Sequence, residues 1–237
     1  MNEESTPNDV SRRTVLRAGA AGVGTLGVVG SAAGDGDEYD DEPADDREPD
    51  PEPEPAVVTE TADVVGQGPD GPVVAENGAT IHRTEHELLI SLSMPTPEPG
   101  SYTYPSEPPE REGEWWTDEV GELEAFSLWA FVFDHPDECV NDCDSEDLGE
   151  PAGGGVFAVT GHVFDGPDLT LNGTVSRETD LYEEDGEPMG LALERPMEAE
   201  VHLAVAPHGA FDPAMMPEIL QTPTGPGPDV WWSAIFD

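Results

Sequence analysis

The chain contains no lysine, and arginine alone supplies its eight basic residues, against 53 Asp and Glu among 237 residues. The formal net charge is therefore −45. Nucleic-acid binding depends on basic surfaces that release counterions from phosphates, so this composition excludes a nucleic-acid-binding protein. It also predicts repulsion from anionic membrane surfaces.

The lack of lysine indicates which solvent the protein is built for. Lysine carries an apolar stem, whereas acidic side chains hold water, and an excess of acid without lysine is typical of halophilic proteins. At ~1 M salt the Debye length falls to about 3 Å, which screens the repulsion between acids. The alternative, a wholly disordered acidic chain, is disfavoured because apolar runs with strand periodicity and all five tryptophans lie beyond about residue 76.

Long hydrophobic runs are also absent, although an uncharged stretch rich in Gly and Ala occupies residues 18–33. It is shorter than the ~20 strongly apolar residues of a membrane span. Just before it, residues 11–17 read S-R-R-T-V-L-R, the twin-arginine export pattern with Arg12 and Arg13 as its pair. Small residues end the stretch at Ala33. We therefore predict a signal peptide at residues 1–33, export by the twin-arginine translocase, and a secreted mature protein without a membrane span.

The segment that follows has few residues that could form a core. Residues 34–55 contain 12 acids, one arginine and five prolines. Alternating proline and acid favours an extended chain that repels itself. We predict a disordered acidic linker over residues 34–75 and one folded domain over residues 76–237. Residues 34–55 carry −11, which leaves −34 on residues 56–237.

Beyond the linker, apolar residues come in short alternating runs separated by Gly, Pro and Asp. Such spacing predicts an all-β domain, a single antiparallel sandwich or barrel-like structure. One short helix is expected from Pro213 to Leu220, since proline suits a first helical turn. The expected strands are Ala79–Arg83, Leu88–Met94, Phe126–Phe133, Gly155–Phe164, Leu169–Val175, Ala199–Ala206 and Val230–Phe236.

Only two cysteines occur, Cys139 and Cys143. In a protein exported to an oxidising exterior, a disulfide between them is the expected state. A zinc site is the alternative, but it needs two further ligands close by. Only His135 is near enough in the sequence, so the disulfide is preferred.

Six histidines are present, and three of them suggest a metal site. Strand periodicity puts His162 and His202 on polar faces, with Glu200 beside His202 and His208 a little further on. If the two strands were neighbours, these residues could supply nitrogen and oxygen ligands to a divalent metal. The alternative is that each ring makes local hydrogen bonds. No other cofactor is expected.

Catalytic motifs are missing: there is no G-x-S-x-G, P-loop, H-E-x-x-H or dinucleotide fingerprint. Two tryptophan pairs, Trp115–Trp116 and Trp231–Trp232, suggest a platform for stacking sugars. Tryptophans in a small β domain also serve as core residues, and the sequence leaves both interpretations open.

A set of motifs resembles a known family. Residues 126–136 read F-S-L-W-A-F-V-F-D-H-P and lead into the paired cysteines, followed by G-H-V at 161–163 and E-V-H-L-A-V-A-P-H-G at 200–209. This order resembles secreted bacterial and archaeal proteins with W-x-V-F-N-x-P, a cysteine pair, G-H-V and V-H-L-V-x-x-H-G. Asp134 stands in place of the usual asparagine. The resemblance covers residues 79–237 and implies a β domain with a two-cysteine loop, but no activity.

Two functions remain open. The first is a secreted, non-enzymatic binding or surface module for a glycan or another extracellular partner, through Trp115, Trp116, Trp231 or Trp232. The second is a metal-binding protein or metal-dependent enzyme that uses His162 and His202. An exposed aromatic patch favours the first function, and convergence of the histidines favours the second.

Overall fold

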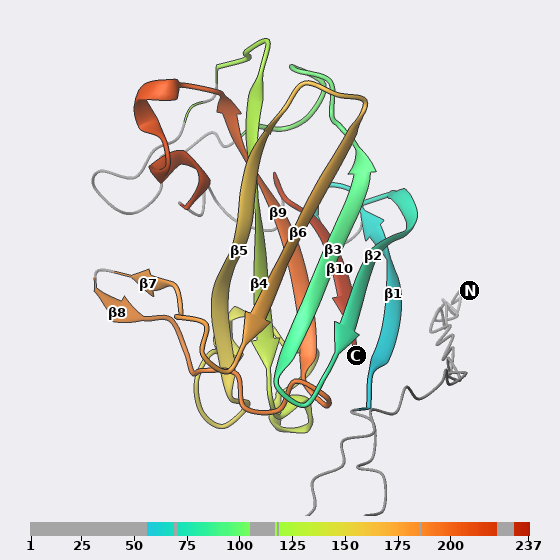
Figure 1. Cartoon of the computed structure of the whole chain (residues 1–237), viewed down its shortest axis with the longest axis vertical. Helices are drawn as coiled ribbons and strands as arrows, with labels where there is room; N and C mark the ends of the chain where they lie inside the picture. The colour runs from blue at the N-terminus through green and yellow to red at the C-terminus, as the bar shows by residue number, and fades with distance from the viewer. Residues whose placement is uncertain (1–55, 69–70, 105–116, 118, 185, 222–229) are drawn as a thin grey trace, which may run out of the picture.

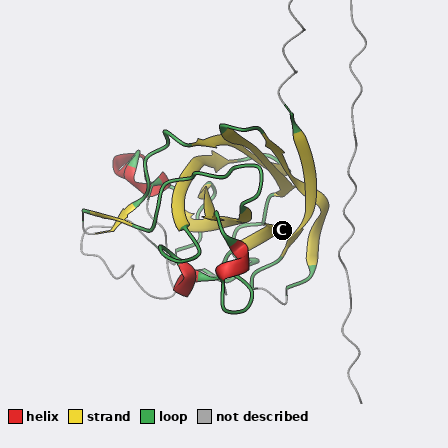
Figure 2. Cartoon of the chain, turned by 90° about the horizontal axis from the view of Figure 1, so that it is seen from below, coloured by secondary structure: helices red, strands yellow, loops and turns green. Residues whose placement is uncertain are grey.

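The computed structural model describes residues 56–68, 71–104, 117, 119–184, 186–221 and 230–237. Eight strands form one antiparallel sheet in the order β5-β4-β9-β10-β1-β2-β3-β6, which curls into a nearly closed barrel (Figures 1 and 2). Their bounds are β1 Val58–Val65, β2 Val73–Arg83, β3 Glu87–Pro95, β4 Glu124–Phe133, β5 Gly154–Phe164, β6 Asp168–Ser176, β9 Glu200–Ala210 and β10 Trp232–Phe236. A separate hairpin pairs β7 (Glu183–Glu184) with β8 (Glu187–Pro188).

Alternating side chains build the barrel core. In β3 the inward residues are Leu88, Ile90, Leu92 and Met94, all buried, and the residues between them face outward. The expected inward set of β9, Val201, Leu203 and Val205, is fully buried in the same cluster. The apolar period of two therefore sets which face of each strand lines the interior.

The barrel closes where its two edge strands, β5 and β6, meet without forming a ladder. At this seam Gly173 of β6 lies against Val159 of β5. A Cβ atom on Gly173 would come within 2.5 Å of Val159 Cγ1, closer than real contacts allow. Glycine is thus needed there because the strands approach so closely.

The all-β, barrel-like fold and all seven expected strands are confirmed. The expected linker boundary at residue 75 is wrong, since β1 and the first residues of β2 lie before it. β1 was missed because acids interrupt its alternation, yet Val64 is fully buried and Ala62 packs against the core. Residues 1–55, which include Arg12, Arg13 and the first part of the linker, lie outside the described residues.

The expected helix over residues 213–220 forms two separate 3₁₀ turns, Pro213–Met215 and Glu218–Leu220. Pro217 stands between them and has no N–H to donate, which interrupts the hydrogen bonding of a single continuous helix. Two further 3₁₀ turns, Pro136–Glu138 and Ser145–Asp147, lie in the loop after β4. Among the residues that the structure describes, no helix has the length and apolar character needed to cross a membrane.

The two outer sides of the barrel differ. Over β4, β5 and β9, which we call the covered side, loops pack on outward aromatic residues and form two small secondary cores, one around Trp129 and Trp231 and one around Phe133. We call the outer face of β1, β2, β3 and β6 the open side. Its outward side chains are mostly small, and they are half-buried or exposed. Figure 1 shows the loops and 3₁₀ turns gathered beside β4, β5 and β9, while β1, β2 and β3 stand free.

Candidate functional site

The structure separates the two histidines that were the basis of the metal hypothesis. His162 lies on β5 opposite Phe126, and His202 lies on β9 opposite Phe131. β4 runs between these strands, and the two positions are five residues apart along it, roughly 17 Å at ~3.4 Å per residue. The side chains thus cannot share one metal at about 2 Å per bond.

Each of the other proposed metal ligands has a local partner. His202 Nε2 lies 2.6 Å from Glu200 Oε1 on the same strand, an ion pair when the ring is protonated. His208 is fully buried on the covered side, and its Nε2 lies 2.8 Å from the hydroxyl of Ser127. That hydroxyl also accepts a hydrogen bond of 2.7 Å from Trp129 Nε1.

Burial lowers the pKa of His208 to about 3, because the charged ring would lose its hydration. The ring is therefore neutral at pH 7 and acts as a buried hydrogen-bonding group. Within the described ranges, no group of three or more His, Cys, Asp or Glu side chains is arranged to hold a metal ion.

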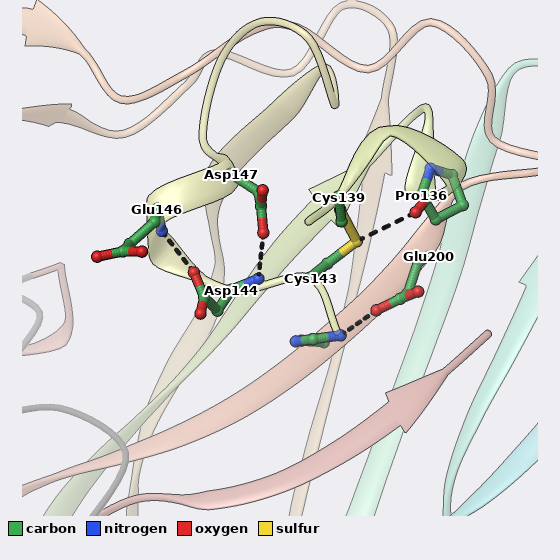
Figure 3. The surroundings of a disulfide bond; sticks show 8 residues. Pro136, Cys139, Cys143, Asp144, Glu146, Asp147 and Glu200 are labelled. Atoms are coloured by element: carbon green, nitrogen blue, oxygen red, sulfur yellow. Dashed lines mark hydrogen bonds and ion pairs between the residues drawn. A yellow bond between two sulfur atoms is a disulfide. The ribbon is translucent and has the colours of Figure 1, made fainter. Parts of the chain in front are cut away.

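The cysteine pair forms the predicted disulfide, with Cys139 and Cys143 bonded across a four-residue separation. Figure 3 shows the bond beside Pro136, whose carbonyl oxygen lies 3.9 Å from Cys143 Sγ. Next to it, the side chain of Asp144 accepts from the backbone of Glu146, and Asp147 reaches back to the backbone of Asp144. The acids of this loop thus cap its own 3₁₀ turn.

Of the two tryptophan pairs, the structure describes only Trp231 and Trp232, and these two side chains do not form a stacking platform. Trp232 lies inside the barrel with its ring edge toward Tyr102 and Phe126, and Trp231 is buried on the covered side near Phe131. Both side chains are less than a tenth exposed. Trp115 and Trp116 lie outside the described residues.

A buried carboxylate lies at one end of the barrel, where β4 begins. Glu124 is only 2% exposed and accepts hydrogen bonds from the hydroxyls of Tyr102 and Tyr104. Burial, and then the bond to Glu124, raises the pKa of both phenols. These two hydrogen bonds hold the loop after β3 against the barrel. Each oxygen of the Glu124 carboxylate accepts one of them.

The open side carries an arrangement that the sequence analysis did not identify. Ten outward residues form a continuous surface without a carboxylate or a basic group other than one imidazole, and we call it the neutral face. Pairing aligns them in cross-strand rows. One row is Thr59, His82, Leu89 and Thr174, the next is Thr61, Thr80, Ser91 and Asn172, and a third holds Ser93 and Thr170.

Some polar groups of the neutral face are joined to one another, and others are open. Thr59 Oγ1 lies 2.8 Å from His82 Nδ1, and Ser93 Oγ lies 3.0 Å from Thr170 Oγ1. The side chains of Thr80, Ser91, Asn172 and Thr174 make no hydrogen bond within the described part of the chain. Directly paired residues have Cβ atoms about 5 Å apart, so these groups form a regular array of donors and acceptors.

Acids surround the neutral face but do not enter it. Asp63 lies on β1, Glu87 at the start of β3 and Asp168 at the start of β6. The neutral face contrasts with the domain as a whole, since residues 56–237 carry −34. The sequence does contain a signal for this face, because serine, threonine or asparagine alternates with apolar residues in L-L-I-S-L-S-M and L-T-L-N-G-T-V. The sequence does not show, however, that these strands lie side by side in the sheet.

Comparison with known proteins gives no relative: no protein-family model, no curated protein and no solved structure matches the chain. The motif resemblance over residues 79–237 stays a prediction.

Proposed function

We propose that the protein is an exported, salt-adapted binding module whose neutral face takes an uncharged, polyhydroxylated polymer, that is, a glycan. The observation that carries this proposal is the array of hydroxyl groups and one amide on β1, β2, β3 and β6, free of acids in a strongly acidic domain. Residues 11–17 support export, since they match the twin-arginine pattern.

Charge is the first reason for a neutral partner. A carboxylate that loses its water without gaining a partner is costly, so surfaces crowded with acids resist close contact. On the neutral face a partner displaces water only from hydroxyls, one amide, one imidazole and one exposed leucine, Leu89. Molar salt screens the attraction between separated charges. Hydrogen bonds between neutral groups do not depend on that attraction.

The form of the surface is the second reason. The unbonded groups of Thr80, Ser91 and Asn172 follow one another across three paired strands. Repeated donors and acceptors on a sheet match the repeated hydroxyls of a polymer. Each further contact between the two raises the overall affinity. No carboxylate lies in the centre of this array, which supports binding in preference to acid–base chemistry.

The test is retention of the folded protein on cellulose, chitin and amylose in ~3 M KCl, with a matched pair of variants. Asn172→Asp adds a charge to the neutral face without changing the shape of the side chain. Asn141→Asp adds the same charge on the exposed disulfide loop. We expect retention on at least one polymer, weakened roughly tenfold by Asn172→Asp because a desolvated, unpaired charge is left at the contact, and unchanged by Asn141→Asp.

Two outcomes contradict the proposal. One is equal retention of the two variants, which would place the contact elsewhere. The other is a stable dimer that Asn172→Asp dissociates and Asn141→Asp does not, measured by light scattering after gel filtration. That result would assign the neutral face to a second copy of the chain.

A further inference from the structure

A second surface lies at one end of the barrel, apart from the neutral face. A pocket of about 230 Å³ forms where the turn between β2 and β3, the segment after β6 and the loop before β9 meet. Its charged lining residues are Glu85, Arg177, Glu194, Arg195 and Glu198, and the ring of His86 also lines it.

The loop that forms one wall is fixed from two sides by buried charged groups. Arg83 is 2% exposed and donates from Nη1 to the carbonyls of Pro196, at 3.0 Å, and Ala199, at 2.7 Å. On the other side, the carboxylate of Asp134 accepts from the backbone N–H groups of Glu194, at 2.7 Å, and Arg195, at 2.8 Å. Such fixed lining lowers the entropic cost of binding a ligand.

Cationic side chains gather at this end of the barrel. The arginines of the described residues are Arg83, Arg177 and Arg195, and all three lie in the pocket lining or directly beneath it. Since the described residues hold three arginines among many acids, the convergence of these three at one pocket distinguishes it from the rest of the described surface.

The charges in the pocket are not all paired. Arg195 forms an ion pair with Glu198, and its Nη1 lies 2.8 Å from Nδ1 of His135. The guanidinium of Arg177 and the carboxylates of Glu85 and Glu194 make no hydrogen bond or ion pair with any residue that the structure describes. The pocket thus presents one open positive group and two open negative groups.

We propose that this pocket binds a small zwitterion, a molecule that carries an oxyanion and a cationic nitrogen. Arg177 provides the planar, forked donor that pairs with a carboxylate or a similar oxyanion. Glu85 and Glu194 accept from the cationic nitrogen. A simple anion would meet the two glutamates and a simple cation would meet Arg177, so only a ligand with both signs satisfies all three groups.

Molar salt strengthens this selectivity. Potassium and chloride at such concentrations compete with any ligand that makes a single ionic contact. A zwitterion makes two contacts at once from one molecule, and the second is then effectively intramolecular. Both contacts lie at hydrogen-bonding distance, where screening with a Debye length of about 3 Å is weakest.

The experiment is isothermal titration calorimetry of the whole protein in ~3 M KCl. The probes are glycine, β-alanine and 4-aminobutyrate, which differ in the separation of their charges, with acetate and ethylammonium as the half-molecules. We expect one-to-one binding of at least one zwitterion and no measurable heat from either half-molecule.

Variants locate the binding. Arg177→Gln and Glu194→Gln each remove one open charge, and we expect each to weaken the best zwitterion roughly tenfold, the usual loss for one charge-assisted hydrogen bond. Glu178→Gln changes an exposed glutamate that does not line the pocket, and we expect no change. Near-UV circular dichroism confirms that the three variants fold alike.

Three outcomes overturn the proposal: binding of acetate or ethylammonium as tight as that of the best zwitterion, heat from none of the probes, or an equal loss in Glu178→Gln and Glu194→Gln. The glycan proposal is tested by a different variant and a different ligand, so either proposal can fail alone.

Discussion

The covered side and the open side of the barrel share one core but use their outward residues differently. On β4 the outward positions include Trp129, Phe131 and Phe133, and loops pack on them as a third layer. On β2 and β3 the outward positions include Thr80, Ser91 and Ser93, and no secondary core formed by the described residues covers them. Among the described residues, loops thus pack where the outward side chains are large and aromatic, and not where they are small and polar.

Charge follows the same division. Seven acids lie between residues 137 and 150, in the loop that covers the end of β4, whereas the neutral face holds none. We therefore expect the loops of the covered side to need screening by salt in order to pack. The open side needs no loops, and its strands are held by backbone ladders and the barrel core.

The largest expected effect is that of salt. We predict a folded domain at ~2–4 M KCl and loss of the near-UV circular dichroism signal in ~10 mM salt, where the Debye length is about 30 Å and −34 is unscreened. At intermediate salt, amide hydrogen exchange should rise in residues 137–150 before it rises in β3. A native signal that persists down to ~10 mM would contradict the halophilic interpretation.

The second prediction compares one residue on each side. Trp129→Ala empties the centre of the secondary core, where the side chain is 1% exposed, and should cost about 3–5 kcal/mol. Leu89→Ala changes an outward residue of the neutral face that is 40% exposed, and should cost less than about 0.5 kcal/mol. Chemical denaturation in ~3 M KCl measures both, and similar costs would show that the open side is also covered.

The smallest effect is that of pH, through His208. The folded protein keeps this ring neutral because its pKa is lowered to about 3, whereas the unfolded chain binds a proton below about pH 6.5. Stability is therefore lost as pH falls from about 6.5 toward 3, by about 2 kcal/mol between pH 7 and pH 5. The variant His208→Gln lacks this contribution, so its free energy of unfolding should fall by about 2 kcal/mol less over the same interval. Parallel pH curves for the two proteins would place His208 in contact with solvent.

Much of the fold could be predicted because it depends on local alternation. The strands around Leu88–Met94 and Phe126–Phe133 were predicted from their apolar period, and the disulfide from the expected export of the chain and the short spacing of its cysteines. β1 was missed because Glu60 occupies an inward position in the run around Val64. That carboxylate is accepted there because it pairs with Arg83, at 2.7 Å, a contact between residues 23 positions apart.

The candidate sites were harder to predict, and the two histidines show why. Alternation placed His162 and His202 on strands, but the order of those strands in the sheet depends on which neighbours each backbone finds. Because β4 lies between β5 and β9, the two histidines are too far apart to bind one metal ion. The neutral face and the pocket arise in the same way, from β1, β2, β3 and β6 and from three segments distant in sequence.

The strongly acidic charge, the alternating strands and the disulfide loop follow from the sequence alone, because each depends on composition or on residues a few positions apart. Only the tertiary structure decided which strands lie side by side, which outward faces the loops cover, and where the arginines converge. Those features depend on long-range backbone pairing and on the closure of the barrel at Gly173, which no local pattern in the chain encodes.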